Sequence, residues 1–169
     1  MLKPKKSLGQ NFLIDQNIIS KIVSLEEINC KNVIEIGPGT GSLTKEILKK
    51  KPKSLILIEK DTKLFLELEK QFKDFKEVKI YNEDVLKFNL EKEIKNETVI
   101  YGNLPYNIST KILTNLIKFK TWPPKYKKLI LMFQKEVAEK ILASFNTPHY
   151  GRLRIMSNYR LSISDNFNI

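Results

Sequence analysis

A tetrapeptide near the middle of the chain, Asn103-Leu104-Pro105-Tyr106, has the composition of a site that holds a planar ring with an exocyclic amino group. Asn103 offers a side-chain carbonyl as a hydrogen-bond acceptor. A residue before proline avoids the α region, so Leu104 is extended and its backbone carbonyl can point outward as a second acceptor. Tyr106 offers a stacking face. The alternative is a turn with a surface tyrosine, and the residues upstream must decide between the two.

Upstream, the segment Glu35-Ile36-Gly37-Pro38-Gly39-Thr40-Gly41 carries glycines at alternate positions between an apolar run and a helix-like stretch. Glycine permits a sharp turn and close approach of the backbone to a ligand, so Gly37, Gly39 and Gly41 are candidate cofactor contacts. Glu59 closes the next apolar run about 20 residues on, where an acid accepts hydrogen bonds from ribose hydroxyls. Asp84 follows the third run and could meet the amino group of an adenine, although a turn or cap aspartate is the alternative.

The glycine spacing separates two cofactors that both contain adenosine. The bend reads G-x-G-x-G, not the G-x-G-x-x-G of NAD sites, and a Pro-Tyr element follows the fourth apolar run. Each of the first four runs therefore contributes one part of a site, in chain order. The combination favours S-adenosylmethionine (SAM) as cofactor and predicts a methyltransferase.

Short apolar runs alternate with amphipathic stretches along the chain. The runs predict strands over residues 32–36, 54–58, 78–81, 98–101 and 128–133, with a late strand beginning within 161–169. Such alternation is typical of an α/β fold, with a doubly wound, mostly parallel sheet covered by helices on both faces. Ligands of these sheets bind beyond the carboxyl ends of the strands, where all the candidate residues above fall.

Helical spacing is expected between these strands. It predicts helices over residues 62–75 and 151–159, with Ser42 and Ser109 as candidate N-caps of two others. The helix after residue 133 is expected to turn these side chains inward: Val137, Ala138, Ile141, Leu142 and Phe145. We divide the chain into an N-terminal arm, residues 1–16, and one catalytic domain, residues 17–169.

Charge and composition narrow the class of protein. The 30 Lys and Arg against 19 Asp and Glu give a net charge of +11, which attracts polyanions and favours nucleic-acid binding over a merely solvated lysine surface. One cysteine and one histidine cannot form a zinc site or an internal disulfide, and we expect no metal. Because the N-terminus has no apolar signal region, we expect a cytoplasmic protein.

Five segments together resemble the ribosomal RNA adenine N6,N6-dimethyltransferases, and among them the small-subunit type. They are residues 8–13, 35–41, 102–109, 133–137 and 150–153. The resemblance implies cofactor contacts from Asn11, Leu13, Gly37, Glu59, Asp84 and Asn103. It also implies a target-base pocket from Asn103, Leu104, Pro105 and Tyr106. Phe133 is either a second stacking ring of that pocket or a core residue at a strand end.

The resemblance implies dimethylation of N6 on two adjacent adenosines near the 3′ end of small-subunit ribosomal RNA. The expected substrate is an immature ribosomal subunit, and the expected state is a monomer. Members of the family continue into a final strand and a small helical domain, so we expect a catalytic-domain fragment. Two alternatives stay open: a large-subunit ribosomal RNA or DNA adenine N6-methyltransferase, and a non-catalytic RNA-binding assembly factor.

Overall fold

A computed structural model of the chain describes residues 12–164 and 167–169. Its strands are β1 (Asn32–Ile36), β2 (Ser54–Ile58), β3 (Val78–Tyr81), β4 (Thr98–Asn103) and β5 (Tyr126–Met132). Its helices are α1 (Gln16–Val23), α2 (Ser42–Lys49), α3 (Thr62–Phe72), α4 (Leu90–Glu93), α5 (Ser109–Ile117), α6 (Lys135–Leu142) and α7 (Arg152–Arg160). Within the described residues, no helix is both long and apolar enough to cross a membrane.

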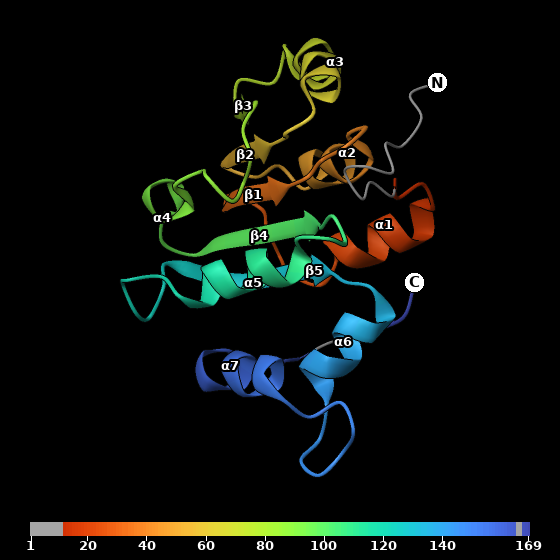
Figure 1. Ribbon diagram of the computed structural model, residues 1–169. Coiled ribbons are helices and arrows are strands. Elements are labelled where there is room, and N and C mark those ends of the chain that lie inside the picture. Colours follow the sequence, from red (N-terminus) through yellow and green to blue (C-terminus); the bar gives the residue numbers. More distant parts are fainter. Residues whose placement is uncertain (1–11, 165–166) are drawn as a thin grey trace.

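The strands form one parallel sheet in the order β3-β2-β1-β4-β5 (Figure 1). The chain first winds outward from β1 to β3 and then returns to β4 beside β1. The ends of neighbouring strands are in register: Ile36, the last residue of β1, pairs with Ile58, the last of β2, and with Gly102, one residue before the end of β4. The residues that follow these strands therefore reach the same level at one edge of the sheet, with the change of winding direction between β1 and β4.

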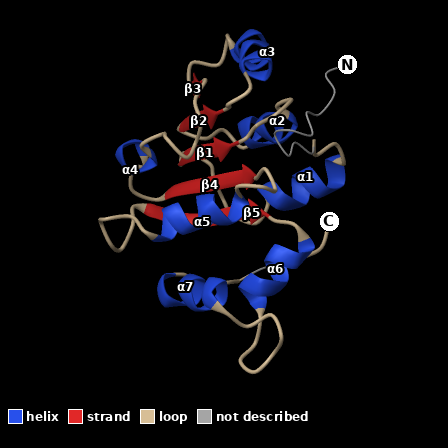
Figure 2. Ribbon diagram, in the orientation of Figure 1, coloured by secondary structure: helices blue, strands red, loops and turns tan. Residues whose placement is uncertain are grey.

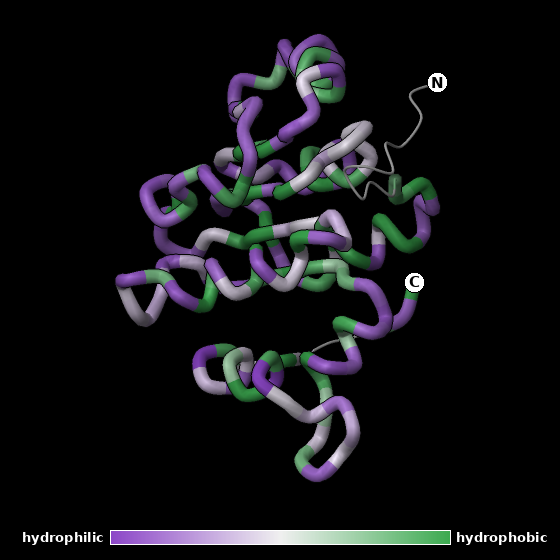
Figure 3. The backbone as a smooth tube through the Cα atoms, viewed as in Figure 1, coloured by the Kyte–Doolittle hydropathy of each residue, from purple (hydrophilic) through white to green (hydrophobic). Residues whose placement is uncertain are grey.

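Two apolar layers hold the sheet between helices. One face of the sheet packs on buried side chains of α1, α2 and α3, among them Ile22, Ile47 and Leu68. The other face packs on α4 and α5 through Leu90, Ile112 and other buried residues. Figure 2 shows these layers, and Figure 3 shows hydrophobic residues along the strands with hydrophilic ones on the outer turns of α3 and α4. The doubly wound α/β fold expected from the sequence is confirmed.

Several expected boundaries are wrong. β4 extends two residues further than expected, to Asn103, and α3 ends at Phe72 rather than at residue 75. The helices α2 and α5 have Gly41 and Ile108 at their N-cap positions, so Ser42 and Ser109 lie one residue inside and cap nothing. The short helix α4 has no counterpart among the expected elements.

The C-terminal part departs furthest from expectation. Residues 161–164 and 167–169 form no strand. Their apolar side chains pack against helices instead of extending the sheet. Leu161 and Ile163 contact the apolar cluster of α5 and α6, and Phe167 contacts the apolar cluster that includes α1. In α6, only Ile141 is buried, whereas Leu142 is exposed and Phe145 lies beyond the helix end with 83% of its surface exposed.

Candidate active site

A cavity opens at the carboxyl ends of β1, β2 and β4, where the register places the residues that follow these strands. Its wall includes seven of the residues singled out in the sequence: Leu13, Gly37, Gly39, Glu59, Asp84, Asn103 and Pro105. Phe12 and Glu35 line it as well. Asn11 lies outside the described residues. The sheet therefore brings most of the expected cofactor residues to the same cavity.

The glycine bend is built from left-handed backbone. Gly37, Gly39 and Gly41 have φ angles of 69°, 59° and 80°. A Cβ atom on Gly37 would lie 3.3 Å from the backbone oxygen of Asn103, so the missing side chain lets β1 and β4 end close together. Gly41 faces away from the cavity, and a Cβ there would meet Gln71 and Phe72 of α3. Its geometry explains a packing role for Gly41, while its cofactor contact stays a prediction.

Glu59 ties the glycine bend to the end of β2. Its carboxylate accepts hydrogen bonds from the backbone N–H of Gly39, at 3.2 Å, and of Asp61, at 2.8 Å. The side chain is buried, and this burial raises the pKa of the Glu59 carboxyl. The backbone N–H of Lys60 also interacts with this carboxylate, and a carboxylate has about four lone-pair directions, so Glu59 can still accept a hydrogen bond from a ligand hydroxyl.

Asp84 lies at the rim of the cavity, where two donors hold it. The backbone N–H of Leu86 donates to Oδ1 at 3.0 Å, and the ammonium group of Lys60 donates to Oδ2 at 2.9 Å. The hydrogen bond from Lys60 holds the pKa of the Asp84 carboxyl below its usual range. Sequence reasoning missed Lys60, although its position directly after Glu59 places it at the same strand end.

Glu35 is a buried acid beneath the glycine bend. Its Oε2 accepts a hydrogen bond of 2.7 Å from the hydroxyl of Thr44 in α2. Burial raises the pKa of Glu35 to about 8, against the lowering effect of the Thr44 hydroxyl, and the charge of Glu59 raises it further. The carboxyl is therefore mostly neutral at pH 7. A glutamate inside an otherwise apolar strand was the sequence signal for this residue.

The tetrapeptide that starts at Asn103 turns at the end of β4. The Leu104 side chain is buried, with 2% of its surface exposed, so only the backbone of this residue can face a ligand. Gly102 makes room for it, because a Cβ there would lie 2.6 Å from Leu104 Cδ2. The Tyr106 ring lies outside the core with 38% of its surface exposed. Pro105 lines the cavity, whereas Leu104 and Tyr106 do not.

Phe133 follows β5 at the same edge of the sheet but lies apart from this cavity. It is partly buried against the apolar clusters around α5 and α6. It lines a second cavity, between β5 and the α6–α7 segment, and not the first. Its role as a second stacking ring stays a prediction.

Comparisons with known proteins agree with this geometry. The family model described as "Ribosomal RNA adenine dimethylase" matches residues 1–164. The ribosomal RNA small subunit methyltransferase A of Pelagibacter ubique is 49% identical over 162 residues, which cover 96% of this chain and 61% of that protein. The protein of the same name from Bartonella bacilliformis is 42% identical over 166 residues, covering 94% and 59%. This chain belongs to the ribosomal RNA adenine dimethylase family.

A solved structure shows the same fold. A dimethyladenosine transferase from Plasmodium falciparum superposes with a TM-score of 0.76 and 32% identity, over 88% of this chain and 52% of that one. The chain spans about three fifths of the length of the two curated relatives above.

Proposed function

We propose that this chain transfers methyl groups from SAM to N6 of adenosines in small-subunit ribosomal RNA. The observation that carries the proposal is one cavity that joins the glycine bend, Glu59 and Asp84 to Asn103 and Pro105. Family membership supports the reaction and the class of RNA. We place the reaction on two adjacent adenosines of an immature small subunit, with the protein acting as a monomer.

The residues around the cavity fit SAM. A Cβ atom at Gly37 would crowd Asn103, and one at Gly39 would crowd Phe12. Because both residues are glycines, the bend presents only backbone atoms to the ligand. Glu59 can accept hydrogen bonds from ribose hydroxyls, and Asp84 from an adenine amino group. The carboxylates also suit a ligand that carries a sulfonium cation. When bound, SAM supplies an electrophilic methyl group.

The end of β4 would hold the target adenine. The side-chain carbonyl of Asn103 and the backbone carbonyl of Leu104 can accept the two amino hydrogens, which localises the nitrogen lone pair for attack. Tyr106 replaces the stacking that the adenine loses when it leaves its RNA helix. Rate enhancement then comes from positioning and electrostatics, and the proton leaves after transfer without a dedicated strong base.

Mapping of methylated nucleotides tests this proposal. The protein is incubated with labelled SAM and immature small subunits, and the RNA is digested and analysed by mass spectrometry. We expect dimethyladenosine at two adjacent positions near the 3′ end, and none with Asn103→Ala. Label on large-subunit RNA would favour the alternative methyltransferase. Binding to the subunit without methyl transfer would favour an assembly factor.

A further inference from the structure

We propose that Lys60 is a positioning residue for the adenine end of the cofactor site, where its ammonium group fixes the orientation of the Asp84 carboxylate as an acceptor for the exocyclic amino group. This role rests on the proposed SAM site. It adds a side chain that selects for adenine over other purines. Lys60 comes from the end of β2 and Asp84 from the segment after β3, and both line the cavity.

Lys60 contacts Asp84 directly, and Asp84 is partly buried. Lys60 Nζ lies 2.9 Å from Asp84 Oδ2, and the side-chain exposures are 58% for the lysine and 18% for the aspartate. Leu86 N–H occupies one position on the other oxygen. Each oxygen therefore has one fixed donor and one remaining lone-pair direction. The two donors set the plane of the carboxylate, and with it the direction in which a ligand amine must approach.

A second set of hydrogen bonds holds the backbone of the same two strand ends together. Asn82 Nδ2 donates to the backbone oxygens of Glu59 and Lys60, at 3.0 and 3.3 Å. Thr62 Oγ1 donates to Asn82 Oδ1 at 3.0 Å and fixes the amide. The loops are thus tied without the lysine side chain. Removal of the Lys60 ammonium group should change the orientation of the Asp84 carboxylate and leave the fold in place.

The charges around Asp84 show why a cation matters there. Glu59 and Glu83 also line the cavity. Burial disfavours the charged form of Asp84, whereas Lys60 favours it through contact and the exposed Lys87 favours it from further away. Among the described residues of the cavity wall, Lys60 is the cation. An ionised Asp84 accepts from the 6-amino group of adenine, whereas the 6-oxo group of hypoxanthine would face it as a second acceptor.

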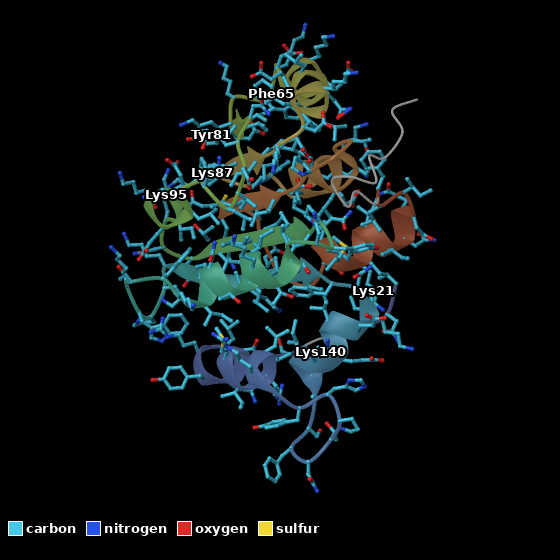
Figure 4. The ribbon with its side chains drawn as sticks, in the orientation of Figure 1. Lys21, Phe65, Tyr81, Lys87, Lys95 and Lys140 are labelled. Atoms are coloured by element: carbon cyan, nitrogen blue, oxygen red, sulfur yellow. The ribbon has the colours of Figure 1, made fainter. Side chains whose placement is uncertain are left out.

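Calorimetry with S-adenosylhomocysteine and its hypoxanthine analogue, S-inosylhomocysteine, tests the role. For Lys60→Met we expect affinity for the adenine compound to fall about fivefold and the preference over the hypoxanthine compound to shrink by a similar factor. Lys60→Arg should restore most of both. The matched control is Lys87→Met, which removes the same charge from the segment after β3, where Figure 4 labels it, and should change affinity by less than about twofold.

The pH profile gives a readout that a structural role would not move. Without Lys60 the pKa of Asp84 rises, so the affinity of Lys60→Met should begin to fall at a higher pH than that of the unmodified protein as the solution is acidified. Equal affinity and equal purine preference in Lys60→Met would overturn the inference while leaving the SAM site intact. Failure of the unmodified protein to bind S-adenosylhomocysteine at all would instead overturn the proposed cofactor, and the role of Lys60 with it.

Discussion

The two sides of the sheet differ in how their functional side chains are held. On the β1–β2–β3 side, polar contacts fix three acids: Gly39 and Asp61 hold Glu59, Thr44 holds Glu35, and Lys60 holds Asp84. On the β5 side, α6 and α7 lie beyond the edge of the sheet (Figure 1), over a cavity of about 720 Å³ with largely apolar walls. Among the described residues there, the buried Ser157 hydroxyl has no hydrogen-bond partner.

The difference shows where the site is organised before ligands arrive. Fixed acceptors suit a small cofactor whose hydroxyl and amino groups must be met at defined points. We call the ends of β4 and β5 the target side, because the proposed reaction puts the target base there. Tyr106 has an exposed ring and Phe133 lies among apolar side chains, which would suit stacking more than exact hydrogen bonding. The lysines labelled in Figure 4 are not confined to one side of the sheet: Lys21, Lys87, Lys95 and Lys140 extend from separate parts of the chain.

The largest expected effect falls on the target side. Tyr106→Ala should slow methyl transfer about ten- to hundredfold, because the flipped base loses its stacking partner. Affinity for S-adenosylhomocysteine, measured by calorimetry, should stay nearly constant. Tyr106→Phe keeps the ring and should retain most activity. Equal losses of transfer and cofactor affinity in Tyr106→Ala would remove the stacking role.

Two glycine substitutions compare the packing of the two sides directly. Gly41→Ala should lower the free energy of unfolding by about 2 kcal/mol, since the residue has φ of 80° and a Cβ would lie 2.6 Å from Gln71 Oε1. Gly151→Ala, before α7, meets nothing within 4 Å. Its effect should stay within about 0.5 kcal/mol. Similar losses for the two variants in urea unfolding would contradict the comparison.

Glu59→Ala tests the polar contacts on the cofactor side. Affinity for S-adenosylhomocysteine should fall about tenfold or more, because the ribose loses its acceptor and the N–H groups of Gly39 and Asp61 lose theirs. The control is Glu69→Ala, an exposed glutamate on α3. Unchanged calorimetric affinity in Glu59→Ala would exclude this carboxylate from the ribose site.

Glu35 should make stability depend on pH. Below its ordinary pKa of 4.5 both the folded and unfolded chains hold the proton, and between there and about 8 only the folded chain does. Stability should therefore fall as pH rises through this window, by up to about 1.4 kcal/mol per pH unit, and level off above it. Glu35→Gln should make this slope shallower in urea unfolding, with the remainder coming from Glu59, whose pKa burial also raises, whereas Glu69→Gln should keep the full slope. An unchanged slope in Glu35→Gln would place the titrating group elsewhere.

The smallest effect is expected beyond α6. Phe145→Ala should change the free energy of unfolding by less than about 0.5 kcal/mol, because the ring is 83% exposed and its edge-to-face contact with Tyr150 lies at the surface. Thermal or urea unfolding measures it. A loss above about 1 kcal/mol would show that this loop packs against the domain in solution.

Prediction from the sequence was most accurate where one physical requirement explains a pattern of residues. The strands β1, β2 and β3 were predicted with the observed bounds, because short runs rich in Ile, Leu and Val favour strands. The alternate glycines and the acids at strand ends gave four of the residues that line the cavity: Gly37, Gly39, Glu59 and Asp84. The parallel register then explains why they meet, since Ile36 and Ile58 end β1 and β2 at the level of Gly102, one residue before the end of β4.

The failures come from contacts that a linear pattern does not contain. Helical spacing placed Phe145 inward, but the helix ends at Leu142. The residues after 160 looked like a strand, yet Leu161 and Ile163 pack on helices instead of pairing with β5. Lys60 was missed because its partner Asp84 lies 24 residues away and is brought near only by the pairing of β2 with β3.

Gly37 affects the distance between the two substrates of the proposed reaction, the methyl donor and the target adenine. Its bare α-carbon lets the end of β1 lie against the carbonyl of Asn103, where a single methyl group would stand only 3.3 Å from that oxygen. In the proposed reaction, donor and acceptor sit on these two neighbouring strand ends. The absence of a side chain at Gly37 would then keep the methyl donor and the amino group close enough for transfer, and any larger residue would push the two strand ends apart.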